Sequence, residues 1–200
     1  MSPKEKIITV FGSSRPREGD ADYAEARALG GALAARSFAV CSGGYGGVME
    51  AASRGAKEAG GRVIGVTAEF FAARANRWVD EEIRVGTWQE RLFRLIEVGD
   101  GFVACKGGTG TLVELAVVWE MLNKRVMAHK PFVVLGDFWQ PVINRVREVE
   151  APSRPSSEQP ATAAATLPAL PWNEADNRLI QRADSPAEVT DCLWRRISAR

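Results

Sequence analysis

The sequence contains little that would support metal chemistry or nucleic-acid binding. It has one histidine, His129, and three cysteines in 200 residues. No residues near His129 have the spacing of a zinc site, and a Ser-His-Asp triad would have to use this single histidine. The net charge is +1, without the basic excess that nucleic-acid binding usually requires. We therefore expect neither a metal ion nor a nucleic acid as a partner.

Long hydrophobic runs are also missing. The first apolar run, residues 7–11, is too short for the core of a signal peptide. No apolar stretch approaches the roughly 20 residues of a membrane-spanning helix. Cys41, Cys105 and Cys192 are odd in number and widely spaced, which favours free, buried thiols over disulfides. These absences predict a cytoplasmic protein without a membrane partner.

What the chain does contain is a regular alternation of short apolar runs with helical patterns. The apolar runs predict strands at residues 7–11, 38–42, 62–66, 102–105 and 131–136. The patterns between them predict helices at residues 21–36, 48–60, 88–100, 111–123 and 139–149. The runs are continuously apolar, as strands buried on both faces should be. We predict an α/β fold, a Rossmann-like, doubly wound parallel sheet with helices on both faces.

One segment interrupts this alternation. Residues 151–171 are rich in Pro, Ala, Ser and Thr and show no periodicity, which is typical of a linker or an excursion from the core. Residues 1–150 would then form a Rossmann-like nucleotide-binding domain. Residues 172–200 would add a strand and a helix to the same domain, with Ser185 as the helix cap and Pro186 in the first position.

Three loops at predicted strand ends are rich in small residues. They are residues 12–14, 43–47 and 107–111, here called the first, second and third loops. In an open parallel sheet, ligands bind beyond the carboxyl ends of the strands. Glycine permits close approach of the backbone, and amides at a helix start attract an anion. Turn geometry alone is the alternative explanation. The residues predicted to contact a phosphate or nucleotide are Ser13, Ser14, Gly43, Gly44, Gly46, Gly47, Gly107, Gly108, Thr109, Gly110 and Thr111.

Two charged residues near the predicted cradle have both structural and functional interpretations. Thr111 and Glu114 fit a capping box, in which Glu114 would only close the helix start. Arg91 borders the apolar stripe of its predicted helix. An arginine in that position extends along the core surface or projects into a cleft. The pattern alone leaves both alternatives open.

An ordered series of motifs resembles the Lonely Guy (LOG) proteins, the cytokinin riboside 5′-monophosphate phosphoribohydrolases. The series is VFGSSR at the first strand, SGGYGGVMEAASRGAKEAGGRVIGV across the second loop and KGGTGTLVE at residues 106–114. Arg91 stands fifteen residues before Lys106, as the family's arginine stands before its glycine signature. The resemblance covers residues 7–150 and, more faintly, 178–197.

The resemblance implies that Arg91 and Glu114 form the catalytic pair. The implied reaction hydrolyses the N-glycosidic bond of a nucleoside 5′-monophosphate, without a metal or organic cofactor. It also implies a homodimer or a larger homo-oligomer. Trp88, Trp119 and Met121 lie on the helices that would supply an interface, although they fit the core equally well.

The chain departs from the family pattern in four places. Lys106 replaces the proline of the signature, Leu92 replaces a lysine, and Ser42 and Glu50 replace glycines. These changes leave open a non-hydrolytic nucleotide-binding protein or one resembling the molybdenum-cofactor carriers. The lysine decarboxylase activity once ascribed to the family is excluded, since no lysine has the context of a pyridoxal Schiff base. The charge disfavours DNA processing.

Overall fold

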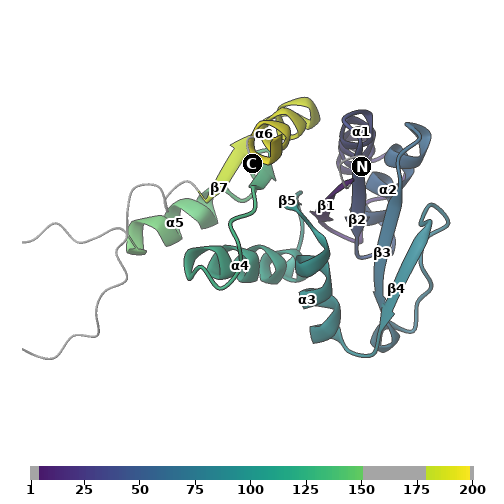
Figure 1. Ribbon diagram of the computed structural model, residues 1–200, viewed down its shortest axis with the longest axis horizontal. Coiled ribbons are helices and arrows are strands. Elements are labelled where there is room, and N and C mark those ends of the chain that lie inside the picture. Colours follow the sequence, from purple (N-terminus) through teal and green to yellow (C-terminus); the bar gives the residue numbers. More distant parts are fainter. Residues whose placement is uncertain (1–4, 151–178, 199–200) are drawn as a thin grey trace, which may run out of the picture.

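The computed structural model describes residues 5–150 and 179–198. Within these residues, seven strands form one sheet in the order β4-β3-β2-β1-β5-β6-β7, and every neighbouring pair is parallel (Figure 1). This confirms the predicted α/β fold. The strands are β1 (Lys6–Phe11), β2 (Phe38–Ser42), β3 (Val63–Ala68), β4 (Glu81–Val85), β5 (Gly101–Ala104), β6 (Phe132–Leu135) and β7 (Ile180–Ala183).

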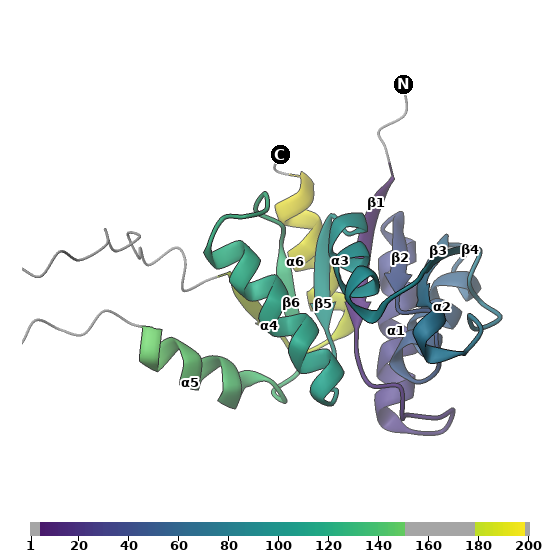
Figure 2. The ribbon, with the colours of Figure 1, turned by 90° about the horizontal axis from the view of Figure 1, so that it is seen from below.

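Helices cover both faces of the sheet (Figures 1 and 2). They are α1 (Ala21–Ala35), α2 (Val48–Glu58), α3 (Trp88–Val98), α4 (Thr109–Asn123), α5 (Gln140–Glu150) and α6 (Pro186–Ser198). Buried side chains of α1, α2 and α6 pack on one face of the sheet, and those of α3, α4 and α5 on the other. Trp119 of α4 belongs to the second layer and is 8% exposed, so this tryptophan is a core residue.

The direction of the chain across the sheet reverses between β1 and β5. β1 to β4 follow one another outward on one side, and the chain then returns to place β5 beside β1. The loops that follow these two central strands therefore lie together. The Ser13 amide donates to the Lys106 carbonyl over 3.2 Å, and the Val48 amide donates to the Ser13 carbonyl over 2.8 Å. In doubly wound sheets, such a reversal opens a crevice for ligands.

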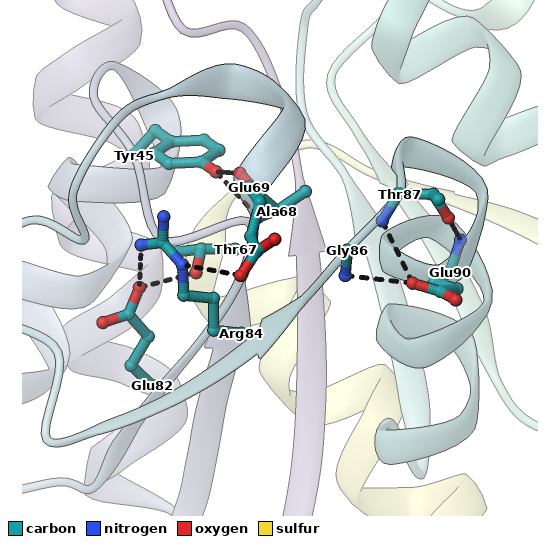
Figure 3. A network of polar contacts seen from close by, with 9 residues as sticks. All are labelled: Tyr45, Thr67, Ala68, Glu69, Glu82, Arg84, Gly86, Thr87 and Glu90. Atoms are coloured by element: carbon teal, nitrogen blue, oxygen red, sulfur yellow. Dashed lines mark hydrogen bonds and ion pairs between the residues drawn. The ribbon is translucent and has the colours of Figure 1, made fainter.

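The strand β4 was not among the predicted strands. Its sequence is EEIRV, and its side chains are exposed or only partly buried, so it lacks the apolar run that reveals the central strands. It lies at the sheet edge, paired with β3. The Thr67 hydroxyl of β3 donates to the Glu82 carboxylate of β4 over 2.6 Å (Figure 3). An edge strand with charged side chains is stabilised by such contacts rather than by burial.

The C-terminal strand and helix join the same sheet and the same helical layer. β7 pairs with β6, and Val189 and Leu193 of α6 are buried beside α1. The Ser185 hydroxyl accepts from the Glu188 amide over 3.2 Å, and Pro186 is the first residue of α6, as predicted. The predicted linker at residues 151–171 lies outside the described residues. No helix among the described residues has the length and apolarity to cross a membrane.

Candidate active site

A cleft of about 1020 Å³ opens at the carboxyl ends of the central strands. The first loop, the third loop and the first turns of α3 line it, together with Tyr45 of the second loop. Of the predicted residues, the cleft brings together Ser13, Ser14, Arg91, Gly107, Gly108, Thr109, Gly110, Thr111 and Glu114. Two loops and two side chains far apart in the sequence thus meet in one place.

The third loop leads into the start of α4, which points at the cleft. Gly108 is the N-cap and supplies no side chain to close the helix. The first amides of a helix have no intrahelical acceptor, and the helix dipole adds partial positive charge. A side chain on Gly107 would place its Cβ 2.2 Å from the Thr111 hydroxyl, so glycine is required there. The arrangement is a backbone cradle for an anion.

Glu114 lies further along α4, and its carboxyl faces the cleft. It keeps an accessible edge there, while burial by the surrounding protein raises its pKa to about 7 and the charge of Arg91 partly offsets this rise. The capping box, one of the two interpretations of Thr111 and Glu114, is absent, since α4 begins at Thr109 and no side chain caps it. Within the described part of the chain, no hydrogen bond or ion pair engages the Glu114 carboxyl. The group is available to a ligand.

Arg91 lies on α3 and is 7% exposed. Its Nε donates to the Val66 carbonyl over 2.8 Å, and its guanidinium lies 5.2 Å from the ring centre of Tyr45 and 5.5 Å from that of Phe71. Burial lowers the pKa of Arg91, and the Glu114 carboxylate raises it. Arg91 also lines the cleft, so the structure combines both alternatives: the side chain is buried against the core and still borders the cleft.

The start of α3 is fixed by a capping box at Thr87. The Thr87 hydroxyl accepts from the Glu90 amide over 3.1 Å, and the Glu90 carboxylate accepts from the Thr87 amide over 3.0 Å (Figure 3). The Gly86 amide donates to the same carboxylate. These backbone hydrogen bonds lower the pKa of Glu90. The hydrogen bonds of this capping box define where α3 begins. They therefore also define where Arg91, one turn later, meets the cleft.

The glycines of the second loop lie behind the cleft wall rather than in it. A Cβ on Gly43 would lie 1.6 Å from an Arg91 nitrogen, and one on Gly47 would lie 2.3 Å from the Ser13 carbonyl oxygen. Gly44 and Gly47 also have positive φ angles, of 73° and 70°, which favour glycine. Gly46 likewise does not line the cleft. The second loop therefore shapes the site through close packing, and only Tyr45 reaches the cavity.

Several lining residues were not predicted. Tyr45, Met49 and Phe71 line the cleft and contact Arg91, and Trp88 also lines the cleft. Tyr45 could have been suspected, because it interrupts a run of glycines at a strand end. Phe71 ends a short 3-10 helix (Glu69–Phe71) that directly follows β3, and it carries no sequence signal. These side chains add apolar surface to a cleft that also presents backbone amides.

Two cations lie at the rim of the cleft beside the cradle. Arg15 lines the cleft, and its guanidinium has no acceptor within the described ranges. The Lys106 ammonium lies 3.0 Å from the Asp22 carboxylate. Both side chains are exposed, so their charges act on an incoming anion through solvent. Among the described residues, no group of three or more His, Cys, Asp or Glu side chains could hold a metal ion.

Comparison with known proteins bears on this site. Residues 5–163 match the SLOG cluster4 family. The chain belongs to this family. A relative from Rhodococcoides fascians, named cytokinin riboside 5′-monophosphate phosphoribohydrolase, is 30% identical over 152 residues, 72% of this chain and 75% of that protein. A Mycobacterium marinum protein of the same name is 36% identical over 117 residues, 57% of this chain and 62% of the relative.

A solved structure extends the comparison to the whole fold. The molybdenum cofactor binding protein from the phototrophic bacterium Rippkaea orientalis has a TM-score of 0.72 and 25% identity, covering 98% of this chain and 99% of that one. The named relatives confirm the resemblance to the Lonely Guy proteins. Enzymes and a cofactor-binding protein are thus both similar to this member of the SLOG cluster4 family.

Proposed function

We propose that the protein hydrolyses the N-glycosidic bond of a nucleoside 5′-monophosphate, releasing a free base of the adenine or cytokinin type and ribose 5-phosphate. The observation that carries the proposal is the Glu114 carboxyl, which lies unpaired within the described residues and shares one cleft with Arg91 and the start of α4. A carboxyl, a guanidinium and an anion cradle are the groups that this reaction needs.

The 5′-phosphate binds at the start of α4 in this proposal. The amides of Thr109, Gly110 and Thr111 donate to its oxygens, and the helix dipole favours its charge. Arg15 and Lys106 at the rim attract it from solvent. Glu114 lies about one helical turn beyond Gly110, roughly 5.4 Å along the axis. A bound phosphate therefore directs its ribose toward this carboxyl.

In the reaction, a water oxygen forms a bond to the anomeric carbon while the bond from this carbon to the base nitrogen breaks. The base takes the bonding electron pair and one proton, and the other water proton remains on the new ribose hydroxyl. Positive charge develops on the sugar in the transition state, and the Glu114 carboxylate stabilises it or orients the water. Arg91 fixes the sugar or phosphate with its planar fork of donors.

The test is incubation of the protein with AMP and with N6-prenylated AMP, followed by chromatography. Release of free base and ribose 5-phosphate is expected, with a loss of about 100-fold or more in Glu114→Gln. Glu120→Gln is the matched control, because Glu120 lies on the same helix with its side chain 57% exposed. Intact nucleotide after long incubation, or equal turnover by Glu114→Gln, contradicts the proposal.

A second candidate function is nucleotide or cofactor binding without hydrolysis. Two observations favour it, namely the similarity to the Rippkaea orientalis protein over 98% of this chain and the presence of Lys106 where the family signature has proline. The same incubation separates the candidates. Saturable AMP binding by calorimetry with no base release supports the binding protein.

We also propose that the protein forms a homodimer or a larger homo-oligomer. Trp88 and Phe93 of α3 and Leu112 of α4 are 36%, 48% and 37% exposed. Apolar side chains exposed on adjacent helices favour burial against a second copy. Light scattering after size-exclusion chromatography tests this proposal, and a monomeric mass at micromolar concentration contradicts it.

A further inference from the structure

Arg91 and Glu114 carry opposite charges in one cleft and do not form an ion pair. No nitrogen of Arg91 lies within 4.0 Å of a Glu114 oxygen. The ion pairs among the described residues all have shorter nitrogen–oxygen distances than this. Attraction between two charges is stronger in a partly desolvated cleft than in water. An arginine side chain is long and flexible, so a specific restraint must hold the guanidinium away from the carboxyl.

Two contacts lead this restraint, beside those of the guanidinium with Sδ of Met49 at 3.8 Å and with the ring of Phe71 at 5.5 Å. The Nε group donates to the Val66 carbonyl over 2.8 Å. The ring of Tyr45 packs against the guanidinium at 5.2 Å, an interaction of a cation with an aromatic face. Tyr45 is itself fixed, because its hydroxyl accepts from the Ala68 amide over 2.9 Å and donates to the Ala68 carbonyl over 3.2 Å (Figure 3).

Gly43 provides the space into which the guanidinium withdraws. The Cβ of any other residue at this position would lie 1.6 Å from Nη2 of Arg91 and 2.7 Å from Sδ of Met49. A methyl group there must displace the guanidinium. The guanidinium already contacts Met49 and the Val66 carbonyl and borders the cleft that Glu114 lines, so we expect it to move into the cleft.

We propose that Tyr45 is a positioning residue, which together with Gly43 holds the Arg91 guanidinium back from the Glu114 carboxyl so that both groups stay open to substrate. The purpose of this arrangement rests on the proposed hydrolase function, while the arrangement itself is measurable without turnover. The charged or titratable groups that face Arg91 are Glu114, Tyr45 and Cys41. Among the described residues, only Arg91 faces Glu114.

The proton affinity of Glu114 reports the position of Arg91. A nearby cation favours the carboxylate, so a guanidinium that moves closer lowers the titration midpoint. The experiment titrates protein labelled with ¹³C at the glutamate carboxyl by NMR, with the Glu114 signal assigned from its loss in Glu114→Gln. The variants are Gly43→Ala, Tyr45→Leu and Tyr45→Phe. Gly31→Ala is the control, because its new Cβ would lie 3.5 Å from its nearest neighbour.

We expect the midpoint of Glu114 to fall by about one pH unit or more, a tenfold change in proton affinity, in Gly43→Ala and Tyr45→Leu. Gly31→Ala should keep the wild-type midpoint, whereas Tyr45→Phe, which retains the ring but loses both hydrogen bonds to Ala68, should show a smaller fall than Tyr45→Leu. Solvent entering a loosened cleft would also lower this midpoint, so each variant is also made in an Arg91→Gln background, where the fall disappears if the guanidinium causes it. An unchanged or raised midpoint in folded Gly43→Ala and Tyr45→Leu overturns the proposal.

A further variant covers the case in which a substitution prevents folding. Phe71 packs on Arg91 at 5.5 Å and is 41% exposed, so Phe71→Leu removes a second aromatic contact from a tolerant position. The titration midpoint of Glu114 should also fall in this variant. A Glu114 midpoint equal to that of wild type counts against the restraint. If the midpoints shift as expected but the protein releases no base, this inference is supported and the hydrolase function is contradicted.

Discussion

Arg91 and Glu114 enter one cleft without an ion pair between them. The helices that carry them, α3 and α4, lie on the same face of the sheet (Figure 1). Burial raises the pKa of Glu114 to about 7, and Arg91 opposes the rise. Both protonation states of this carboxyl are therefore populated near neutral pH. A group that titrates in this range can exchange a proton with substrate or water, which makes the pH dependence of the protein informative.

Activity should increase with pH as Glu114 loses its proton. If the carboxylate stabilises the developing charge on the sugar, kcat/KM rises through pH 7 and levels off above it. Arg91 keeps its charge throughout this range, because arginine remains protonated in proteins. Initial rates of base release between pH 5 and 9 test this expectation. A plateau that already begins near pH 5 would show that an unperturbed carboxyl, rather than Glu114, governs the rate.

Stability should show the opposite trend with pH. The folded-state pKa of Glu114 lies near 7, above its ordinary value of 4.5, so the folded protein binds this proton more tightly than the unfolded chain. Its contribution to the free energy of unfolding is then greatest below pH 4.5 and is lost as the pH rises through 7.

Glu114→Gln removes this titration and isolates its effect on stability. At pH 8 the free energy of unfolding of the variant should exceed that of wild type by about 1 to 3 kcal/mol. Solvent in the cleft favours the lower value. The difference should vanish near pH 4.5. Urea unfolding at both pH values measures it, with Glu120→Gln as the exposed control. If the variant is less stable than wild type at pH 8, burial does not make the Glu114 carboxylate destabilising, and the prediction is wrong.

Replacement of Arg91 by lysine should not preserve activity. Lysine lacks the Nε donor that binds the Val66 carbonyl and the planar group that packs against Tyr45. We expect kcat/KM to fall by about 100-fold, since misplacement of a contact group by about 1 Å has this effect. Arg94→Lys, at an exposed site of α3, should resemble wild type. Equal activity of the two variants would mean that Arg91 contributes only a charge.

The sequence contains two Thr-x-x-Glu patterns, and they illustrate what pattern alone can predict. The pattern at Thr111 and Glu114 suggested a capping box, but α4 begins at Thr109, and the Thr111 hydroxyl lies where a side chain on Gly107 would be. The pattern at Thr87 and Glu90 forms a true capping box. The choice depends on where each helix begins, which is set by packing of the preceding loop.

The central strands were predictable because burial on both faces makes them continuously apolar, as in FAVCS of β2. The charged edge strand β4 has no such signal. Arg91 and Glu114 were predicted through the resemblance to the Lonely Guy proteins, and the third loop through its small residues at a strand end. The contacts of Tyr45 and Phe71 with Arg91 depend on how the loops cross the sheet edge, and this leaves no periodic pattern in the sequence.

The third loop should tolerate a side chain at one glycine and not at another. A Cβ on Gly107 would lie 2.2 Å from the Thr111 hydroxyl, whereas one on Gly110 meets no atom within 4 Å. We expect Gly107→Ala to lower the free energy of unfolding by about 1 to 3 kcal/mol and to weaken AMP binding. Gly110→Ala should fold like wild type. Calorimetric unfolding and AMP titration test both variants, and equal stability of the two would contradict the close contact.

The capping box of α3 should affect both stability and ligand binding. Thr87→Ala removes the hydroxyl that accepts from the Glu90 amide, which should lower the free energy of unfolding by about 1 kcal/mol and the melting temperature by roughly 2 to 4 °C. The first turn of α3 then frays, and Arg91 in the next turn loses its fixed position. AMP binding should weaken as well.

A second helix cap separates these two effects. Ser185→Ala removes the hydroxyl that accepts from the Glu188 amide at the start of α6, a comparable loss on the opposite face of the sheet, away from Arg91. It should lower the melting temperature by a similar amount and leave AMP affinity unchanged. If both variants bind AMP as wild type does, the start of α3 does not control the position of Arg91, and the second loop alone must hold its guanidinium in the cleft.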